Sequence, residues 1–337
     1  MKEGWYLIEI NMGVKRIHEL DYIRCIAMFM VVMGHVLLFS LKIEHTALLG
    51  IIGICEMPLF FIVSGYLTYK EREESLKETM ARLLKRSRTL LVPLVVWSIV
   101  LNLCDEKITF SLSMVYRGGY WFFVALWWCD ILNTFAVYIS KKFKFGIIAD
   151  IVLYASIYAV ILLGRIKNID LGGILPIQNV QYYFPFFILG LLHKYKLVND
   201  VILNKYSYAV GMLLLIIGWY FSTIESFVIW FVAALGGVVV VWMVCREINS
   251  ELKVAKMLSI IGKNTLPIYA IHYLFIAIMP CTLRDVINIP HGFFFLLVIT
   301  FVYAVLVIIL CLLVDRILSL NPITRMIFWG ESKKREW

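Results

Sequence analysis

Charged side chains are scarce in this chain of 337 residues, of which only 16% are Asp, Glu, Lys or Arg. Soluble domains carry about 25% charged residues, so an ordinary soluble protein and a disordered chain are both excluded. Glycine (20) and proline (8) are too few for a collagen-like chain. The seven cysteines have no spacing typical of a zinc site or a disulfide framework. Walker loops, dinucleotide-binding glycine patterns and internal repeats are also missing.

The sequence instead contains long apolar segments, and 62% of its residues are hydrophobic. A helix needs about 20 mostly apolar residues to cross a bilayer. The runs are continuously apolar rather than alternating, which excludes a β-barrel. We therefore predict an all-α, polytopic transmembrane helical bundle of about ten spans, forming a single integral membrane domain over residues 1–337. The predicted spans are 20–41, 47–69, 89–104, 120–139, 147–163, 180–193, 206–221, 226–245, 265–280 and 293–314.

The net charge of +9 is explained mainly by topology. Of the 32 Lys and Arg residues, 25 lie in one alternate set of loops and six in the other, while Arg24 lies within the first span. This excess predicts that both termini are cytoplasmic. The basic residues border membrane helices rather than forming a soluble basic domain, so nucleic acid is not an expected partner. The longest extramembrane stretch, about 70–88, is predicted to be a charged helical hairpin.

The first span carries the densest set of ionisable groups, namely Asp21, Arg24 and His35. Such groups cost roughly 2.5–3.5 kcal/mol each at the centre of a membrane helix, so each is a functional candidate. Eleven residues place Arg24 and His35 on one helix face, roughly 16 Å apart along the axis. Arginine suits phosphate and histidine can remove a hydroxyl proton. Alternatively, Arg24 is a snorkelling anchor and His35 a hydrogen-bonded core histidine.

The second span contains Glu56, followed by MPLFFIVSGYL (57–67). Glu56 can orient His35 if the first two helices form a hairpin, pair with another buried donor, or snorkel outward. For Ser64 and Gly65 we favour close helix packing over ligand contact.

The segment RLLKRSRTLLVP (82–93) places four cations before the third span, and they serve either topology or the binding of a nucleotide phosphate. They are Arg82, Lys85, Arg86 and Arg88.

Three aromatic-rich segments follow. GYWFFVALWW (119–128) is either an interfacial aromatic belt or, through Trp121, a sugar contact. Pro185 is expected to kink or break its short span. In KNTLPIYAIHYLF (263–275), His272 lies one turn after Tyr269 and favours a structural hydrogen bond over direct chemistry. Asp130 within the fourth span needs a partner that the sequence does not identify.

Taken in order, six segments resemble motifs of the acyltransferase-3 family of bacterial membrane acyltransferases, over about residues 18–316. The first helix of that family carries Arg or Lys, ten residues, then His, and Arg24 and His35 match it here. One departure concerns the family's Arg-x-x-Arg ahead of the third helix, which only Arg82-x-x-Lys85 and Lys85-x-x-Arg88 approximate. The six segments are ELDYIRCIAMFMVVMGHV, MPLFFIVSGYL, RLLKRSRTLLVP, GYWFFVAL, QYYFPFFILGLLHKY and IGKNTLPIYAIHYLF.

The resemblance implies an acyl-CoA donor on the cytoplasmic side and transfer to a hydroxyl, usually of a glycan. It suggests His35 as the catalytic residue. We expect His35 to act as general base or as a transient acyl carrier, and we add Glu56 as the residue that orients it. Donor contacts are predicted at Arg24, Lys85, Arg86 and Arg88. Substrate contacts are predicted at Ser64, Tyr66, Trp121, Tyr269 and His272.

Our hypothesis is therefore an O-acetyltransferase of the bacterial cytoplasmic membrane that acts on a surface polysaccharide or its lipid-linked precursor. Acetyl-CoA would be a co-substrate, with no permanently bound cofactor and no metal. The expected partners are an acyl-CoA donor, a glycan or lipid-linked glycan acceptor, and the lipid bilayer. One alternative is an exporter of a glycan or lipid-linked glycan unit, although transporters often show inverted repeats that we do not find. Another is transfer to an amine, or to a lipid or peptidoglycan hydroxyl.

Overall fold

The computed structural model describes residues 18–68, 75–104, 119–168, 175–194, 205–221, 226–278 and 292–331, which form helices and no strands. The first helix, α1, continues into a π-helical turn, η2. The elements are α1 (His18–His35), η2 (Val36–Ser40), α2 (Ala47–Thr68), α3 (Leu76–Cys104), α5 (Trp121–Phe143), α6 (Ile147–Ile166), α7 (Ile177–Lys194), α8 (Lys205–Tyr220), α9 (Phe227–Arg246), α10 (Lys253–Lys263), α11 (Thr265–Ile278), α13 (Phe293–Leu318) and α14 (Pro322–Trp329).

Seven of these helices are long and apolar enough to cross a membrane. They are α1 with η2, α2, α3, α5, α6, α9 and α13, and α8 and α11 are shorter apolar helices. Each of the ten predicted spans coincides with a helix, which confirms a polytopic helical bundle. The short helices α10 and α14 were not predicted. The cytoplasmic position of the termini stays a prediction from the loop charges.

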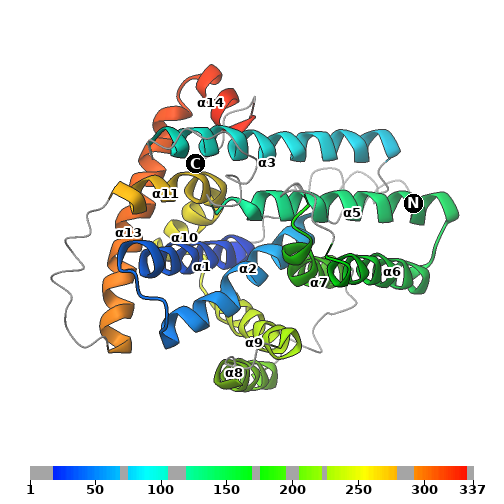
Figure 1. The fold of residues 1–337 in the computed structure, drawn as a ribbon, viewed down its shortest axis with the longest axis horizontal. Coiled ribbons are helices and arrows are strands. Elements are labelled where there is room, and N and C mark those ends of the chain that lie inside the picture. The colour runs from blue at the N-terminus through cyan, green and yellow to red at the C-terminus, as the bar shows by residue number, and fades with distance from the viewer. Residues whose placement is uncertain are drawn as a thin grey trace, which may run out of the picture.

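The first two helices form the centre of the molecule (Figure 1). In their most apolar windows, 56% of α1 and 61% of α2 are buried inside the protein, against 17% of α6. Figure 1 shows α8 and α9 side by side at one edge and α13 at another. Large apolar side chains such as Val160, Leu213 and Val298 are exposed on α6, α8 and α13. Such faces are suited to lipid, so the peripheral helices separate the buried early helices from the bilayer.

Helix α3 begins earlier than its apolar span predicts, because a capping box lies before it. The backbone N–H of Ser75 donates to Glu78 Oε2 (2.8 Å), and that of Glu78 donates to Ser75 Oγ (3.3 Å). Our prediction of a hairpin over 70–88 is wrong for its described part, because residues 76–88 continue directly into the span. Residues 70–74 lie outside the described residues. The basic segment is therefore part of one continuous helix.

The tight contact of α2 with α7 depends on two glycines. A Cβ on Gly65 would overlap the Phe187 carbonyl, and a Cβ on Gly190 would overlap the Ile62 carbonyl. Small residues at such crossings let membrane helices approach closely. Helix α7 is continuous through Pro185, so the predicted break is wrong. Gly65 therefore serves close helix packing, the interpretation that we favoured over ligand contact.

Replacing Gly65 with alanine is expected to destabilise the protein by about 3 kcal/mol, because a backbone carbonyl cannot move aside without separating the helices. The measurement is the thermal unfolding midpoint of the purified protein in detergent. Gly53→Ala is the matched control in the same helix, since a Cβ there meets no atom within 4 Å. Equal midpoint shifts in the two variants would contradict the assigned role of Gly65.

Candidate active site

A cavity of about 440 Å³ opens between α1, α2, α3, α5 and α11, and its lining is rich in cations. Four basic side chains and two carboxylates border it. Most of these residues come from helix ends that the loop charges assign to the cytoplasmic side. An excess of positive charge in a partly enclosed space favours an anionic ligand. The charged residues are Arg24, Arg82, Arg86, Lys263, Asp130 and Glu331.

Only one face of α3 contributes to this cavity. Arg82 and Arg86 are four residues apart, so they lie within about 40° of each other around the helix. Lys85 and Arg88 are rotated away from Arg82 by about 60° and 120° on the other side. Both are exposed, and neither lines the cavity. The structure thus brings together Arg24 and Arg86 of the predicted donor set, adds Arg82 and Lys263, and leaves out Lys85 and Arg88.

The structure identifies the partner of Asp130, which the sequence left open. Arg86 Nε donates to Asp130 Oδ2 at 3.0 Å, and the carboxylate is 6% exposed against 38% for the guanidinium. Thr68 Oγ1 lies 3.5 Å from Asp130 Oδ1. Arg82 Nη1 donates to the Thr68 carbonyl at 3.0 Å. These contacts join α2, α3 and α5 at the cavity and fix the direction of both arginines.

Arg24 is held by a second carboxylate. It forms an ion pair with Asp21, three residues before it on the same helix. Asp21 is buried and also accepts a hydrogen bond from Ser259 of α10 at 3.0 Å. The α1 arginine is thereby fixed against α10, whose last residue is the cavity-lining Lys263.

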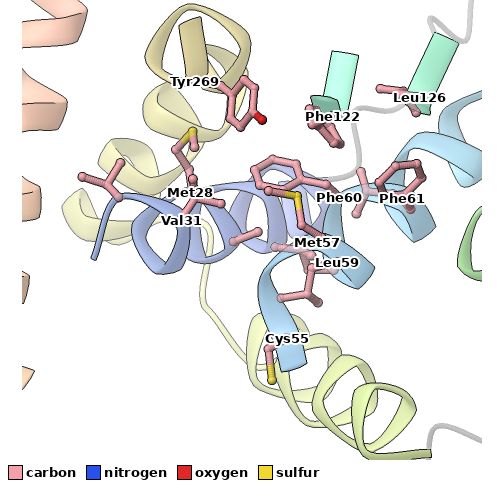
Figure 2. Close-up of a cluster of buried hydrophobic side chains, with 14 of the residues drawn as sticks. Met28, Val31, Cys55, Met57, Leu59, Phe60, Phe61, Phe122, Leu126 and Tyr269 are labelled. Carbon is pink, nitrogen blue, oxygen red and sulfur yellow. The ribbon is translucent and has the colours of Figure 1, made fainter. Parts of the chain in front are cut away.

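Aromatic rings close the inner end of the cavity. Figure 2 shows Phe60, Phe122 and Tyr269 arriving from α2, α5 and α11. The Tyr269 ring centroid lies 5.2 Å from that of Phe122 and 5.1 Å from that of Phe123, and all four rings line the cavity. Beyond them, the Tyr269 ring lies 5.6 Å from the His272 ring. A single aromatic layer therefore separates the cations from the histidines.

Behind that layer, two histidines and a tyrosine form one hydrogen-bonded cluster. His35 Nδ1 lies 2.7 Å from His272 Nε2, and the Tyr273 hydroxyl lies 3.2 Å from His35 Nε2. His272 is fully buried and His35 is half-buried. His35 is the last α-helical residue before the π turn η2, an irregularity that often occurs at functional sites. The cluster joins α1 to α11.

Glu56 does not make the contact that we predicted for it. Its Oε2 lies beside Gly34, where an added Cβ would be 3.6 Å away, but no described hydrogen bond joins it to His35. His272 occupies the hydrogen-bonding position on His35 instead. The described residues also contain no group of three or more His, Cys, Asp or Glu side chains placed to hold a metal ion.

The turn before α5 is joined to α11 by reciprocal hydrogen bonds. Tyr269 donates to the Gly119 carbonyl and Tyr120 donates to the Ala270 carbonyl, both at 2.6 Å. Gly119 has φ +75°, and a side chain there would also collide with the Tyr273 hydroxyl. The GYW segment therefore supports the histidine cluster through the Gly119 carbonyl and the Tyr120 hydroxyl, and the close approach of Tyr273 explains the glycine.

The other predicted substrate residues are divided between two places. Ser64 and Tyr269 line the cavity. Tyr66 packs on Trp242 of α9, with ring centroids 6.1 Å apart. Trp121 is half-buried and stacks on Tyr183 of α7 at 5.4 Å. The structure thus separates Tyr66 and Trp121 from the cavity.

Sequence reasoning did not assign Tyr273 or Lys263 to the site, and it named Arg82 among the candidate phosphate-binding cations but left it out of the predicted donor contacts. Tyr273 directly follows His272, and Arg82 belongs to the quoted basic segment, so both were within recognised motifs. Once α3 is known to begin at Leu76, helical periodicity shows that Arg82 and Lys85 point in different directions around the helix. Lys263 also lies within a recognised motif, IGKNTLPIYAIHYLF, but we assigned it no role.

Comparison with known proteins adds one match. A family model described as an acyltransferase domain matches residues 17–316. That range includes the histidine cluster and every charged cavity residue except Glu331. No curated protein matches the chain, and no solved structure matches it.

Proposed function

This chain belongs to the acyltransferase-3 family and is a membrane acyltransferase, and on that premise we propose that it is an O-acetyltransferase using acetyl-CoA. The acceptor is a hydroxyl of a surface polysaccharide or of its lipid-linked precursor. The enzyme acts in the bacterial cytoplasmic membrane, with the bilayer, the donor and the glycan as its partners and without a resident cofactor or metal.

One observation carries the proposal, namely a cation-lined cavity that ends one aromatic layer away from a histidine cluster. The cavity suits the phosphates of a nucleotide donor, which arginine forks bind in bidentate geometry. Arg24 and His35 lie on one helix, roughly 16 Å apart along its axis. A donor with a long arm, anchored by its phosphates, therefore has its thioester directed toward His35.

The proposed reaction is direct acyl transfer. His35 Nε2 takes the proton of the acceptor hydroxyl while the acceptor oxygen bonds to the thioester carbonyl carbon. The C–S bond then breaks, and the leaving thiolate takes the proton from His35. The Tyr273 hydroxyl, 3.2 Å from Nε2, marks the position of the acceptor hydroxyl.

Carbohydrate is the favoured acceptor class because aromatic rings gather between the start of α5 and α7. Trp121 stacks on Tyr183, and Tyr183 packs edge-on against Trp230 of α9 at 5.7 Å. All three rings are half-buried, so each keeps an accessible part. Such rings stack on the apolar faces of sugars. They lie at helix ends that the loop charges assign to the outer side.

The orientation of α3 predicts which cations bind the donor. Arg82→Ala is expected to raise the KM for acetyl-CoA about tenfold, equivalent to ~1.4 kcal/mol, with a smaller effect on kcat. Arg88→Ala is the matched control, because this exposed arginine of the same helix does not line the cavity. Steady-state kinetics in proteoliposomes measure both. A larger KM change for Arg88→Ala would contradict the donor orientation.

The proposed function is tested with labelled acetyl-CoA and purified protein in vesicles that contain the native glycan fraction. We expect label in the glycan, and we expect a deletion strain to lose the mass increment of acetyl groups from its surface polysaccharide. Unchanged acetylation combined with accumulation of glycan inside the cell would favour an exporter instead. Label in protein amines, lipid or peptidoglycan would keep the mechanism and change the acceptor.

A further inference from the structure

His272 has both ring nitrogens within hydrogen-bonding distance of protein atoms. Its Nδ1 lies 2.7 Å from the Tyr269 carbonyl oxygen and 3.2 Å from that of Ile268. Its Nε2 lies 2.7 Å from His35 Nδ1. Carbonyl oxygens only accept hydrogen bonds, so the hydrogen of a neutral His272 is on Nδ1.

The position of this hydrogen determines the tautomer of His35. A neutral imidazole has one N–H, so His272 Nε2 is an acceptor and His35 Nδ1 must be the donor. His35 Nε2 then keeps its lone pair and accepts from the Tyr273 hydroxyl at 3.2 Å. No carboxylate among the described residues hydrogen-bonds to either ring. A cationic ring would therefore lack a hydrogen-bonded counter-charge in this apolar centre, which favours the neutral pair.

We infer that His272 is a positioning residue that holds His35 in the tautomer and orientation in which Nε2 is the base. The inference rests on the proposed function, in which Nε2 takes the acceptor proton. It concerns the juxtaposition of the end of α1 with α11, where the two rings lie nearly parallel, with an interplanar angle of 9°.

The expected effect follows from removing His272 Nε2, the hydrogen-bond acceptor for His35 Nδ1. Without His272, the hydrogen of His35 is free to move to Nε2, the nitrogen that carries it in most neutral histidine in water, and that tautomer cannot accept a proton there. In serine proteases, a comparable change to the residue that orients the catalytic histidine lowers kcat by about 10⁴-fold. A neutral acceptor is weaker than a carboxylate, so we expect a loss of about 10²-fold here.

Two amide substitutions separate positioning from packing. The amide of His272→Gln reaches the place of Nε2 and can accept from His35. The amide of His272→Asn reaches only the place of Nδ1. It therefore keeps the hydrogen bond to the Tyr269 carbonyl and loses the hydrogen bond with His35. We expect kcat within about fivefold of wild type for His272→Gln and about 10²-fold lower for His272→Asn. The KM for acetyl-CoA should change by less than about twofold in both.

A spectroscopic measurement tests the tautomer without activity. Magnetic resonance of protein with isotope-labelled histidine in lipid nanodiscs distinguishes protonated from unprotonated ring nitrogens, and His35→Ala and the His272 variants assign two of the six histidines. We expect His35 to carry its hydrogen on Nδ1 in wild type and in His272→Gln. In His272→Asn we expect the hydrogen on Nε2.

Two results would overturn the inference: His35 protonated on Nε2 in wild type, or equal kcat losses in folded His272→Gln and His272→Asn. If His272→Asn does not fold, the wild-type tautomer alone decides. If the wild type transfers no acyl group, the proposed function fails, while the tautomer measurement still tests the hydrogen bond. The two failures are therefore distinguishable.

Discussion

Replacing His35 with alanine is expected to lower kcat for acetyl transfer by about 10³-fold, within the range that general base catalysis contributes. The reason is geometric, since the Tyr273 hydroxyl lies 3.2 Å from His35 Nε2, the nitrogen that serves as the base in the proposed mechanism. In the proposed function the donor phosphates bind in the cavity beyond Tyr269, so the KM for acetyl-CoA should change little. Initial rates with labelled acetyl-CoA in proteoliposomes give both constants.

His45→Ala is the matched control for this experiment. His45 is exposed and lies between η2 and α2, away from the cluster. Its replacement should leave kcat and KM at wild-type values. A His35→Ala enzyme that keeps its rate would remove His35 from the mechanism and return it to the alternative of a hydrogen-bonded core histidine. Label that stays on wild-type protein in the absence of acceptor would indicate an acyl-histidine intermediate instead of direct transfer.

The second large effect is expected at the Arg86–Asp130 pair. Arg86→Met leaves the buried Asp130 carboxylate without its guanidinium partner. Removing one member of a buried pair costs about 3–5 kcal/mol, but Arg86 is 38% exposed, so we expect about 2 kcal/mol. Donor affinity should fall as well, because Arg86 lines the cavity. The unfolding midpoint and the KM for acetyl-CoA report the two losses separately.

A double variant separates stability from donor binding. Arg86→Met combined with Asp130→Leu replaces both charges by apolar groups, which is often neutral for stability. We expect the unfolding midpoint to recover while the KM for acetyl-CoA stays raised, because the cavity still lacks one guanidinium. Recovery of both quantities would show that Arg86 only neutralises Asp130. Recovery of neither would show that the pair has a packing role that an apolar substitute cannot fill.

Much of the fold could be predicted, because membrane helices follow from local composition. Every predicted span coincides with a helix, since continuous apolar runs leave the backbone no other way to satisfy its hydrogen bonds in lipid. The misjudged segments were polar or contained proline. At α3, the Ser75–Glu78 capping box extends the helix beyond the apolar run. At α7, the helix continues through Pro185 and packs closely against α2.

The candidate site was only partly predictable. The eleven-residue spacing correctly placed Arg24 and His35 on one helix, because periodicity within a helix is a local property. The cations of α3 were not divided into cavity and surface residues, since that division depends on where α2 and α5 pack. The partner of Asp130 lies 44 residues away and that of His35 lies 237 residues away. No pattern within one segment encodes such pairs.

Scarcity of charge and abundance of apolar runs were enough to determine a helical membrane protein with the densest set of ionisable groups in its first span. Hydropathy and loop charge are sums over neighbouring residues, so both can be calculated from the sequence without knowing the tertiary structure. The choice of His272 rather than Glu56 as the residue that meets His35 was decided only by packing. From the sequence, either Glu56 or His272 could have contacted His35, depending on how the helices pack. The contact between α1 and α11, supported by Gly119, places the His272 ring against the His35 ring.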